Sequence, residues 1–194
     1  IKVAKAAGFD FIEISVDESD ERLSRLQWTK EERSTLVSLF QKNGLQFESM
    51  CLSGHRRFPF GSKNEETRNK AYLIMDQAIE LALDLGIHNI QLAGYDVYYE
   101  ESDDETIALL IEGLRYSSKK AESSGVMLTL EIMDTYLMGT ISRALEYVNI
   151  VHSPNLNIYP DLGNLTQWSD NPEEELIKGI DHIIAIHLKD TKPG

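Results

Sequence analysis

Three side chains that can bind a divalent metal ion recur at similar intervals in the second half of the sequence. Glu131 lies near the end of residues 127–134, Asp161 follows some way on, and His187 lies within residues 185–190. They are 30 and 26 residues apart (161 − 131 and 187 − 161), each about one strand-helix-strand step. Two carboxylates and an imidazole suit Mn²⁺, Mg²⁺, Co²⁺ or Zn²⁺, and three ligands leave coordination positions open. The spacing therefore predicts an open metal centre.

Another arrangement of the same residues needs no metal ion. Apolar and polar side chains alternate through residues 127–134, so Glu131 shares the polar face of a buried strand. A carboxylate in that position costs several kcal/mol to desolvate unless a cation or hydrogen bonds receive it. In the alternative, Glu131 pairs with a basic residue such as Lys189, Asp161 forms a turn and His187 is a hydrogen-bonded core histidine. The common register of the three favours the metal site.

The elements that must position these residues follow a repeated pattern of helix, glycine and strand. A glycine after the last helical turn can adopt the left-handed conformation that ends a helix. The glycines of this pattern are Gly8, Gly44, Gly86 and Gly125. The predicted helices are 29–43, 65–85, 103–123, 142–151 and 172–180, and the predicted strands are 11–16, 45–53, 89–94, 127–133, 156–161 and 183–189. Strict alternation of this kind predicts parallel strands joined by helical crossovers.

The two faces of the predicted strands favour a barrel over an open sheet. One parity is apolar in strand after strand, and the other carries polar residues such as Glu13, Gln91 and Glu131. An open sheet covered by helices on both faces would need both parities to be apolar. The fold class is therefore α/β, a (β/α)8 TIM barrel with its polar site at the carboxyl ends of the strands. Because six strands are predicted, we expect a single domain over 1–194 that is cropped at both ends, with the first and last strands outside it.

Composition narrows the possible partners. The 194 residues include 32 acidic and 19 basic side chains, for a formal charge of −13, which disfavours binding to nucleic acid or to an anionic membrane. No segment approaches the roughly 20 apolar residues of a membrane span. Cys51 is the one cysteine, which excludes an internal disulfide and leads us to expect a cytoplasmic protein.

Six motifs together carry a family resemblance. They are residues 9–18, 50–59, 91–99, 130–134, 159–161 and 187–194. In these motifs the chain resembles the L-ribulose-5-phosphate 3-epimerases, xylose-isomerase-like TIM barrels that are also labelled hexulose-6-phosphate isomerases. The resemblance runs nearly end to end. It implies an isomerase of L-ascorbate degradation and related pentose metabolism that interconverts L-ribulose 5-phosphate and L-xylulose 5-phosphate, a pair of phosphorylated ketopentoses. The resemblance also implies a homodimer.

The resemblance also implies roles for the three candidate ligands. The family holds its metal with a Glu, an Asp, a His and a second Glu from four successive strands, and Glu131, Asp161 and His187 match the first three. The second Glu is expected beyond Gly194. The two Glu residues of the family exchange the C3 proton through a metal-stabilised enediolate, which makes Glu131 the expected catalytic residue here.

The predicted substrate contacts are His55, Arg56, Arg57, Asn164 and Lys189. His55, Arg56 and Arg57 form the densest basic cluster of an acidic chain, and Arg forks suit phosphate oxygens. The alternative is a solvated Arg pair. Lys189 and Lys192 are second candidates for the phosphate. Asn164 replaces the His that epimerases of unphosphorylated ketoses carry three residues after the metal Asp, and its amide can donate to a substrate hydroxyl.

Other functions on the same scaffold stay open. The first is an aldose-ketose isomerase of the hexulose-6-phosphate type, and the second is a non-catalytic barrel that binds sugar phosphates. A DNA-repair endonuclease of the superfamily needs a His-rich zinc cluster and a basic face, whereas this chain has five histidines and a charge of −13. Glu13 is interpreted as part of a buried hydrogen-bond network.

Overall fold

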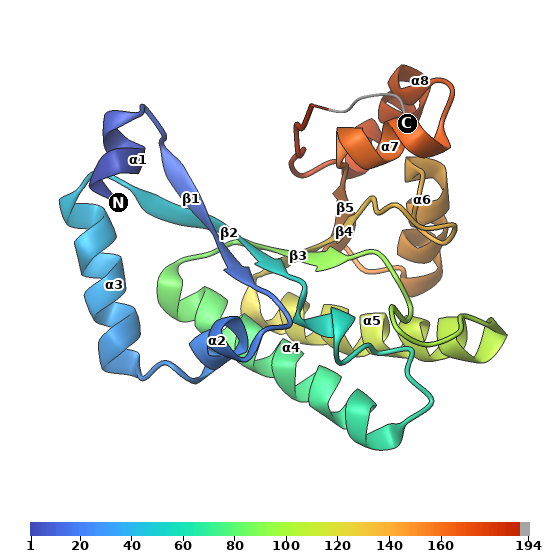
Figure 1. The fold of residues 1–194 in the computed structure, drawn as a ribbon, viewed down its shortest axis with the longest axis horizontal. Helices are drawn as coiled ribbons and strands as arrows, with labels where there is room; N and C mark the ends of the chain where they lie inside the picture. Colours follow the sequence, from blue (N-terminus) through green and yellow to red (C-terminus); the bar gives the residue numbers. More distant parts are fainter. Residues whose placement is uncertain (191–194) are drawn as a thin grey trace.

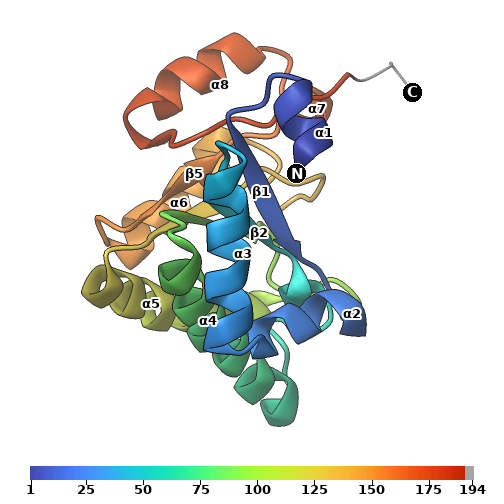
Figure 2. The ribbon, with the colours of Figure 1, turned by 90° about the vertical axis from the view of Figure 1, so that its left-hand side faces the viewer.

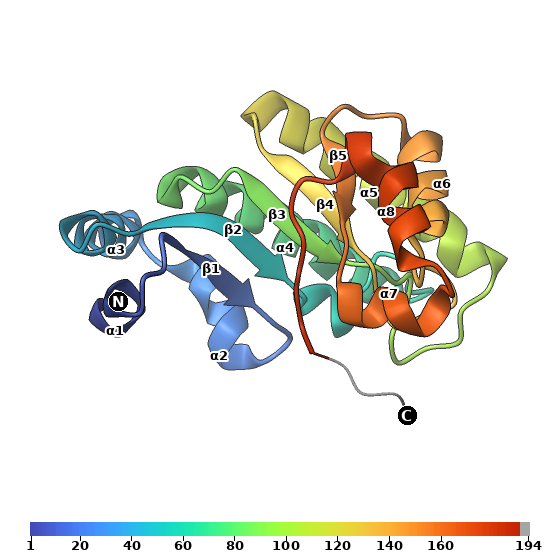
Figure 3. The same cartoon turned by 90° about the horizontal axis from the view of Figure 1, so that it is seen from above.

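A computed structural model describes residues 1–190, which form a five-stranded parallel sheet with helices on its outer face (Figure 1). The strands follow one another in chain order, so each βα unit adds the next strand beside the last (Figure 3). They are β1 (Phe11–Val16), β2 (Gln46–Leu52), β3 (Asn89–Ala93), β4 (Met127–Glu131) and β5 (Leu156–Tyr159). This arrangement confirms the predicted parallel βα fold.

Helices connect the strands and cover the outer face. Contacts join α3 to α4, α4 to α5 and α5 to α6, so these four helices lie side by side in chain order (Figures 1 and 2). The α-helices are α1 (Lys2–Ala6), α2 (Asp20–Leu23), α3 (Lys30–Lys42), α4 (Glu65–Leu85), α5 (Asp104–Ser124), α6 (Ile141–Val151), α7 (Leu162–Trp168) and α8 (Pro172–Gly179). The 3₁₀ helices are η1 (Ser24–Gln27), η2 (Gly54–Arg56) and η3 (Ile180–His182).

Local signals set the ends of the long helices. Thr29 and Glu32 form a reciprocal capping box at the start of α3. Gly86 and Gly125 follow α4 and α5 with φ angles of +71° and +69°, the left-handed region that glycine enters without a Cβ clash. The predicted boundaries of these three helices therefore agree with the structure to within about a residue.

The two faces of the sheet differ as predicted. Side chains of the outward parity lie in the core under the helices. Five of them are fully buried: Val16, Met50, Ile90, Leu128 and Ile158. The inward parity is polar: Thr129 Oγ1 donates a hydrogen bond to Asn89 Oδ1 at 3.0 Å inside the sheet. Among residues 1–190 the helices cover the outer face, and the polar face is available for chemistry.

The structure differs from the sequence prediction in two places near the candidate site. Residues 183–189, predicted as a sixth strand, are joined to the sheet by two isolated parallel bridges, Ile158 to Ile183 and Asp161 to His187. A continuous ladder requires successive pairs, and here the backbone pairs at only two points along this stretch. The short helix α7, which begins directly after Asp161, was not predicted. Its seven residues span about two turns, too few to give a clear helical pattern.

Candidate metal centre

Three neighbouring βα units bring the predicted ligands together. Glu131 is the last residue of β4, and Asp161 follows β5 as the N-cap of α7. His187 is held beside Asp161 because its backbone N–H donates to Pro160 O at 2.9 Å and its carbonyl accepts from Leu162 N–H at 3.1 Å. Ligand atoms of Glu131, Asp161 and His187 all lie within 4.8 Å of one another. The three side chains that the sequence placed on the same inward parity therefore meet at one point.

These three side chains fit a divalent cation in both chemistry and spacing. Ligands that each lie about 2.1 Å from one ion are at most about 4.2 Å apart. The observed spread of up to 4.8 Å therefore needs only a small side-chain adjustment. Two carboxylates also provide the negative charge that a dication needs at a partly buried site.

The His187 ring lies between two carboxylates. Its Nδ1 is 3.4 Å from Glu131 Oε1 and 3.2 Å from Gln91 Nε2, and its Nε2 is 3.4 Å from Glu13 Oε1. Tyr159 packs against the ring with centroids 4.6 Å apart. Hydrogen bonding to Glu13 and then to Glu131 raises the pKa of His187 to about 10. Since a ligating imidazole nitrogen must be deprotonated, a proton and a metal ion compete for this ring.

Glu13 is also bound on its far side. Ser49 Oγ donates to Glu13 Oε2 at 2.5 Å. Burial acts to raise the pKa of Glu13, but hydrogen bonds from His187 and Ser49 outweigh it and the pKa is lowered overall. The sequence placed Glu13 in a buried network but did not connect it to His187. Its inward parity, shared with Glu131, was the available signal.

Asp161 combines two tasks. Its Oδ1 accepts from Asn164 N–H at 3.0 Å, which caps α7, and its Oδ2 lies 2.9 Å from Lys189 Nζ. Lys189 also donates to Asn164 Oδ1 at 2.8 Å, and Asn164 Nδ2 donates to Ile132 O at 2.9 Å. The lysine of the metal-free alternative therefore pairs with Asp161 and not with Glu131. Asn164 and Lys189 lie beside the candidate ligands, where both were predicted to contact substrate.

The three neighbouring basic residues of the predicted phosphate cluster have separate surroundings. His55 is buried in the core, where its ring packs on Phe60 and Nε2 lies 3.2 Å from Ala71 O. Burial lowers the pKa of His55 to about 4. This differs from the expected basic side chain at the mouth of the strand, because the turn η2 directs the ring toward α4.

Arg56 and Arg57 extend from the same turn toward different acidic partners. Arg56 lies 3.6 Å from Glu18 and over the ring of Tyr98, at 4.6 Å from the centroid. Arg57 pairs with Asp20 at 2.7 Å. Arg56 thus joins the loops that follow β1, β2 and β3, at the carboxyl ends of those strands. Lys192 lies outside the described residues.

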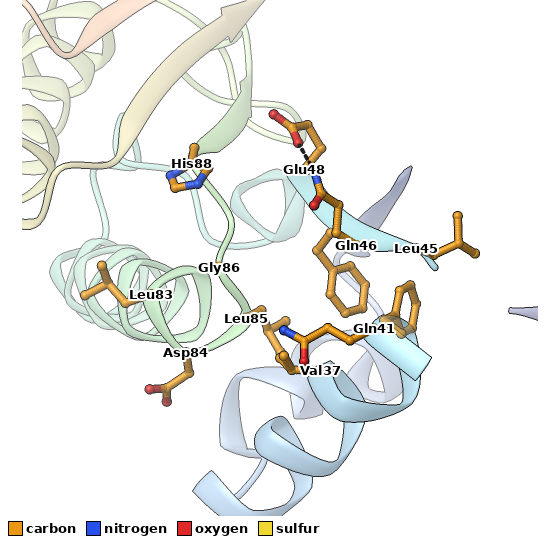
Figure 4. Close-up of a pocket in the computed structure, with 12 residues that line it drawn as sticks. Val37, Gln41, Leu45, Gln46, Glu48, Leu83, Asp84, Leu85, Gly86 and His88 are labelled. Atoms are coloured by element: carbon orange, nitrogen blue, oxygen red, sulfur yellow. Dashed lines mark hydrogen bonds between the residues drawn. The ribbon is translucent and has the colours of Figure 1, made fainter. Parts of the chain in front are cut away.

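A separate cavity of about 340 Å³ opens at the other end of the sheet. Figure 4 shows Val37 and Gln41 of α3, Leu85 of α4 and His88 around it, together with the start of β2. Its lining comes from α3, the start of β2, the end of α4 and the segment just before β3. The candidate ligands lie at the carboxyl ends of the strands, so this cavity does not belong to the metal centre.

The parallel βα architecture agrees with a known family. The sequence profile of the xylose isomerase-like TIM barrel family matches residues 1–194. The chain belongs to this family. No helix among the described residues of this xylose isomerase-like barrel is long and apolar enough to cross a membrane.

Two curated relatives of this xylose isomerase-like barrel carry the same enzyme name. L-ribulose-5-phosphate 3-epimerase UlaE of Escherichia coli (strain SE11) is 50% identical over 194 residues, which is all of this chain and 68% of the relative. A protein of Haemophilus influenzae, provisionally named L-ribulose-5-phosphate 3-epimerase SgbU, is 54% identical over 193 residues and is covered to the same extent. The resemblance predicted from the six motifs is confirmed.

A solved structure supports the fold. D-psicose 3-epimerase from Clostridium cellulolyticum H10, crystallised with D-tagatose, matches 96% of this chain and 64% of its own chain with a TM-score of 0.82. The two sequences are 21% identical. The match therefore supports the TIM-barrel architecture and carries no conclusion about substrate.

Proposed function

We propose that this protein is a metal-dependent 3-epimerase that interconverts L-ribulose 5-phosphate and L-xylulose 5-phosphate. The observation that carries the proposal is the convergence of Glu131, Asp161 and His187 at the carboxyl ends of the strands. It occurs in a chain that is 50% identical, over all its residues, to a relative named for this reaction. The metal, the substrate and the site residues are parts of the proposal.

Inversion at C3 of a 2-ketose requires loss of a proton from the carbon next to a carbonyl. A divalent cation held by the three ligands would polarise the carbonyl and stabilise the negative charge that develops on the substrate oxygens. Glu131 is the base or acid at C3, because it is the last residue of β4 and its carboxylate lies on the polar inward face of the sheet beside the other candidate ligands. A second acid on the opposite face of the sugar must return the proton for the configuration to invert.

Positive and amide groups around Asp161 are proposed to orient the sugar. Lys189 Nζ and the Asn164 amide lie together beside Asp161, where they can hold a substrate oxygen in place. Arg56 is proposed to receive the phosphate, since its guanidinium stands at the strand ends and can exchange the long 3.6 Å contact with Glu18 for phosphate oxygens. His55, buried against Phe60, is proposed to support that turn.

Isotope exchange tests the reaction directly. Purified protein with Mg²⁺ and L-ribulose 5-phosphate in D₂O should place deuterium at C3 and form L-xylulose 5-phosphate, as followed by NMR and mass spectrometry. Glu131→Gln should lower the rate by at least about 10³-fold, while the exposed α5 substitution Glu112→Gln leaves it unchanged. Deuterium at C1 would instead indicate an aldose-ketose isomerase.

Metal dependence separates an enzyme from a binding protein. Removal of divalent cations with EDTA should abolish C3 exchange, and added Mn²⁺ or Mg²⁺ should restore it. Binding of the sugar phosphate without exchange, under conditions where the cation is bound, would identify a non-catalytic sensor on the same barrel.

A further inference from the structure

A carboxylate of β1 reaches the His187 imidazole from the side opposite to Glu131. Glu13, in the middle of β1, lies 3.4 Å from His187 Nε2, whereas Glu131 lies 3.4 Å from Nδ1. Glu131 is one of the three candidate ligands, so the Nδ1 side of the ring faces the candidate ligand set. The two ring nitrogens therefore face two different carboxylates, and one of these is outside the ligand set.

An irregularity in the sheet places Glu13 there. The parallel register between β1 and β2 pairs Ile12 with Phe47 but pairs Glu13 with Ser49, so Glu48 is an additional residue on β2. A bulge of this kind re-aims the side chains that follow it. As a result Ser49 lies opposite Glu13, and its hydroxyl donates to the Glu13 carboxylate at 2.5 Å.

Contacts on both sides of the Glu13 carboxylate fix its orientation. Ser49 is 5% exposed, and Glu13 is half-buried between Ser49 and the imidazole. Tyr159 packs on the His187 ring and limits its rotation. Ser49, Glu13 and His187 form a chain of contacts that runs from the sheet to the candidate metal centre.

We propose that Glu13 is a positioning residue that accepts the Nε2 proton of His187 and so keeps Nδ1 free to bind the metal ion. A carboxylate on the far nitrogen sets the tautomer and orientation of a ligating histidine and increases its basicity. This inference rests on the metal centre of the proposed function. Glu13 does not touch the ion or the sugar in this assignment, and its effect is transmitted through His187.

Metal affinity tests the assignment without substrate. The dissociation constant for Co²⁺ is measured by competition with a chelator, and the visible spectrum of bound Co²⁺ reports its geometry. Glu13→Ala should weaken binding by about 10- to 100-fold, and Glu13→Gln, which keeps an acceptor without the charge, should weaken it less. Glu48→Ala is the matched control, because its carboxylate contacts Gln46 and should leave Co²⁺ affinity unchanged.

A spectroscopic readout distinguishes positioning from general support of the fold. In the Zn²⁺-loaded protein, long-range ¹H–¹⁵N NMR should show His187 with its proton on Nε2, and Glu13→Gln should shift that signal while apo-protein thermal unfolding changes little. The signal is assigned by its loss in His187→Gln. If Glu13→Ala does not fold, the Co²⁺ affinity and the His187 signal of Glu13→Gln test the proposal on their own.

The outcomes separate the two proposals. Wild-type protein that binds no divalent cation would overturn the metal centre and the proposed function with it. Wild-type protein that binds Co²⁺ with the same affinity and spectrum as folded Glu13→Ala or Glu13→Gln would overturn the role of Glu13 alone.

Discussion

Two histidines show how surroundings decide the behaviour of one residue type. His55 is buried without a charged partner, and burial lowers its pKa to about 4. His187 lies between Glu13 and Glu131, which raise its pKa to about 10. Burial penalises the charged imidazole in the first case, and carboxylates stabilise it in the second. The first histidine therefore serves packing, and the second holds a proton that a bound metal ion would have to displace.

The depressed pKa of His55 predicts acid-sensitive stability. In the unfolded chain the ring binds a proton near pH 6.5, and in the folded protein it does so near pH 4, so its contribution is complete above pH 6.5 and is lost as the pH falls toward 4. Between pH 7 and pH 5 it should reduce the free energy of unfolding by about 2 kcal/mol. Urea denaturation of metal-free His55→Gln should lack this loss, and the exposed-site control His88→Gln should retain it. An equal pH dependence in His55→Gln and wild type would contradict the assignment.

The Cys51 thiol should react slowly in the folded protein. Burial, and then the nearby charges of Glu131 and Glu13, raise the pKa of Cys51 to about 12, so little thiolate exists at pH 8. Modification by a disulfide reagent, followed by absorbance, should be at least about 100-fold slower in native protein than in urea. Comparable rates in the two states would show that the inward side of β2 is open to solvent and reagent.

At the scale of elements, one residue both ends a secondary-structure element and belongs to the candidate site. Asp161 ends the segment that follows β5, caps α7 through Asn164 N–H and is also a candidate ligand. The carboxyl end of a parallel strand and the start of the next helix meet at the same edge of the sheet. The side chain of Asp161 is therefore held in place by its hydrogen bond to the first turn of α7.

Substitution of Asp161 should separate these two tasks. Asp161→Asn keeps an acceptor for the Asn164 N–H and should retain most of the stability, whereas Asp161→Ala should lose an additional 1 kcal/mol or so with the cap. Both variants should lose Co²⁺ affinity because the anionic ligand is gone. Urea unfolding and chelator competition measure the two effects. Full Co²⁺ affinity in Asp161→Asn would remove Asp161 from the ligand set.

At the scale of the whole molecule, a bound ion should link separate βα units. The ligands come from β4, from the loop after β5 and from the segment that follows α8. A cation that binds only the folded arrangement stabilises it by about 2.7 kcal/mol at a free concentration 100 times its dissociation constant.

This linkage predicts a metal-dependent melting temperature. Mn²⁺ at about 100 times its dissociation constant should raise the midpoint of thermal unfolding by several degrees, as measured by calorimetry or circular dichroism. Glu131→Gln should abolish most of that rise, and the surface substitution Glu112→Gln should leave it intact. A rise of equal size in Glu131→Gln would place the stabilising ion elsewhere.

Much of the fold was predictable because its signals are local. Thr29 and Glu32 mark the start of α3, and Gly86 and Gly125 mark the ends of α4 and α5. Alternating parity also separated the core-facing side of each strand from its polar side. The stretch 183–189 was predicted as a strand and forms isolated bridges, because a strand depends on continuous pairing with a neighbour.

The candidate site was predictable in part for the same reason. Glu131, Asp161 and His187 share a parity and lie one βα unit apart, and parallel strands bring such positions to one edge. His55, Arg56 and Arg57 are adjacent in sequence, yet the η2 turn sends them to the core, to Glu18 and to Asp20. Proximity along a turn does not make side chains converge.

The sequence by itself determined the alternation of strands and helices, the polar inward face and the three residues that could share an ion, since these depend on local backbone preference and on parity. The tertiary structure alone decided that Glu13 meets the far nitrogen of His187, that Lys189 pairs with Asp161 and that His55 is buried. Such contacts depend on a bulge in the register, on the direction of a turn and on the packing of residues far apart in the chain.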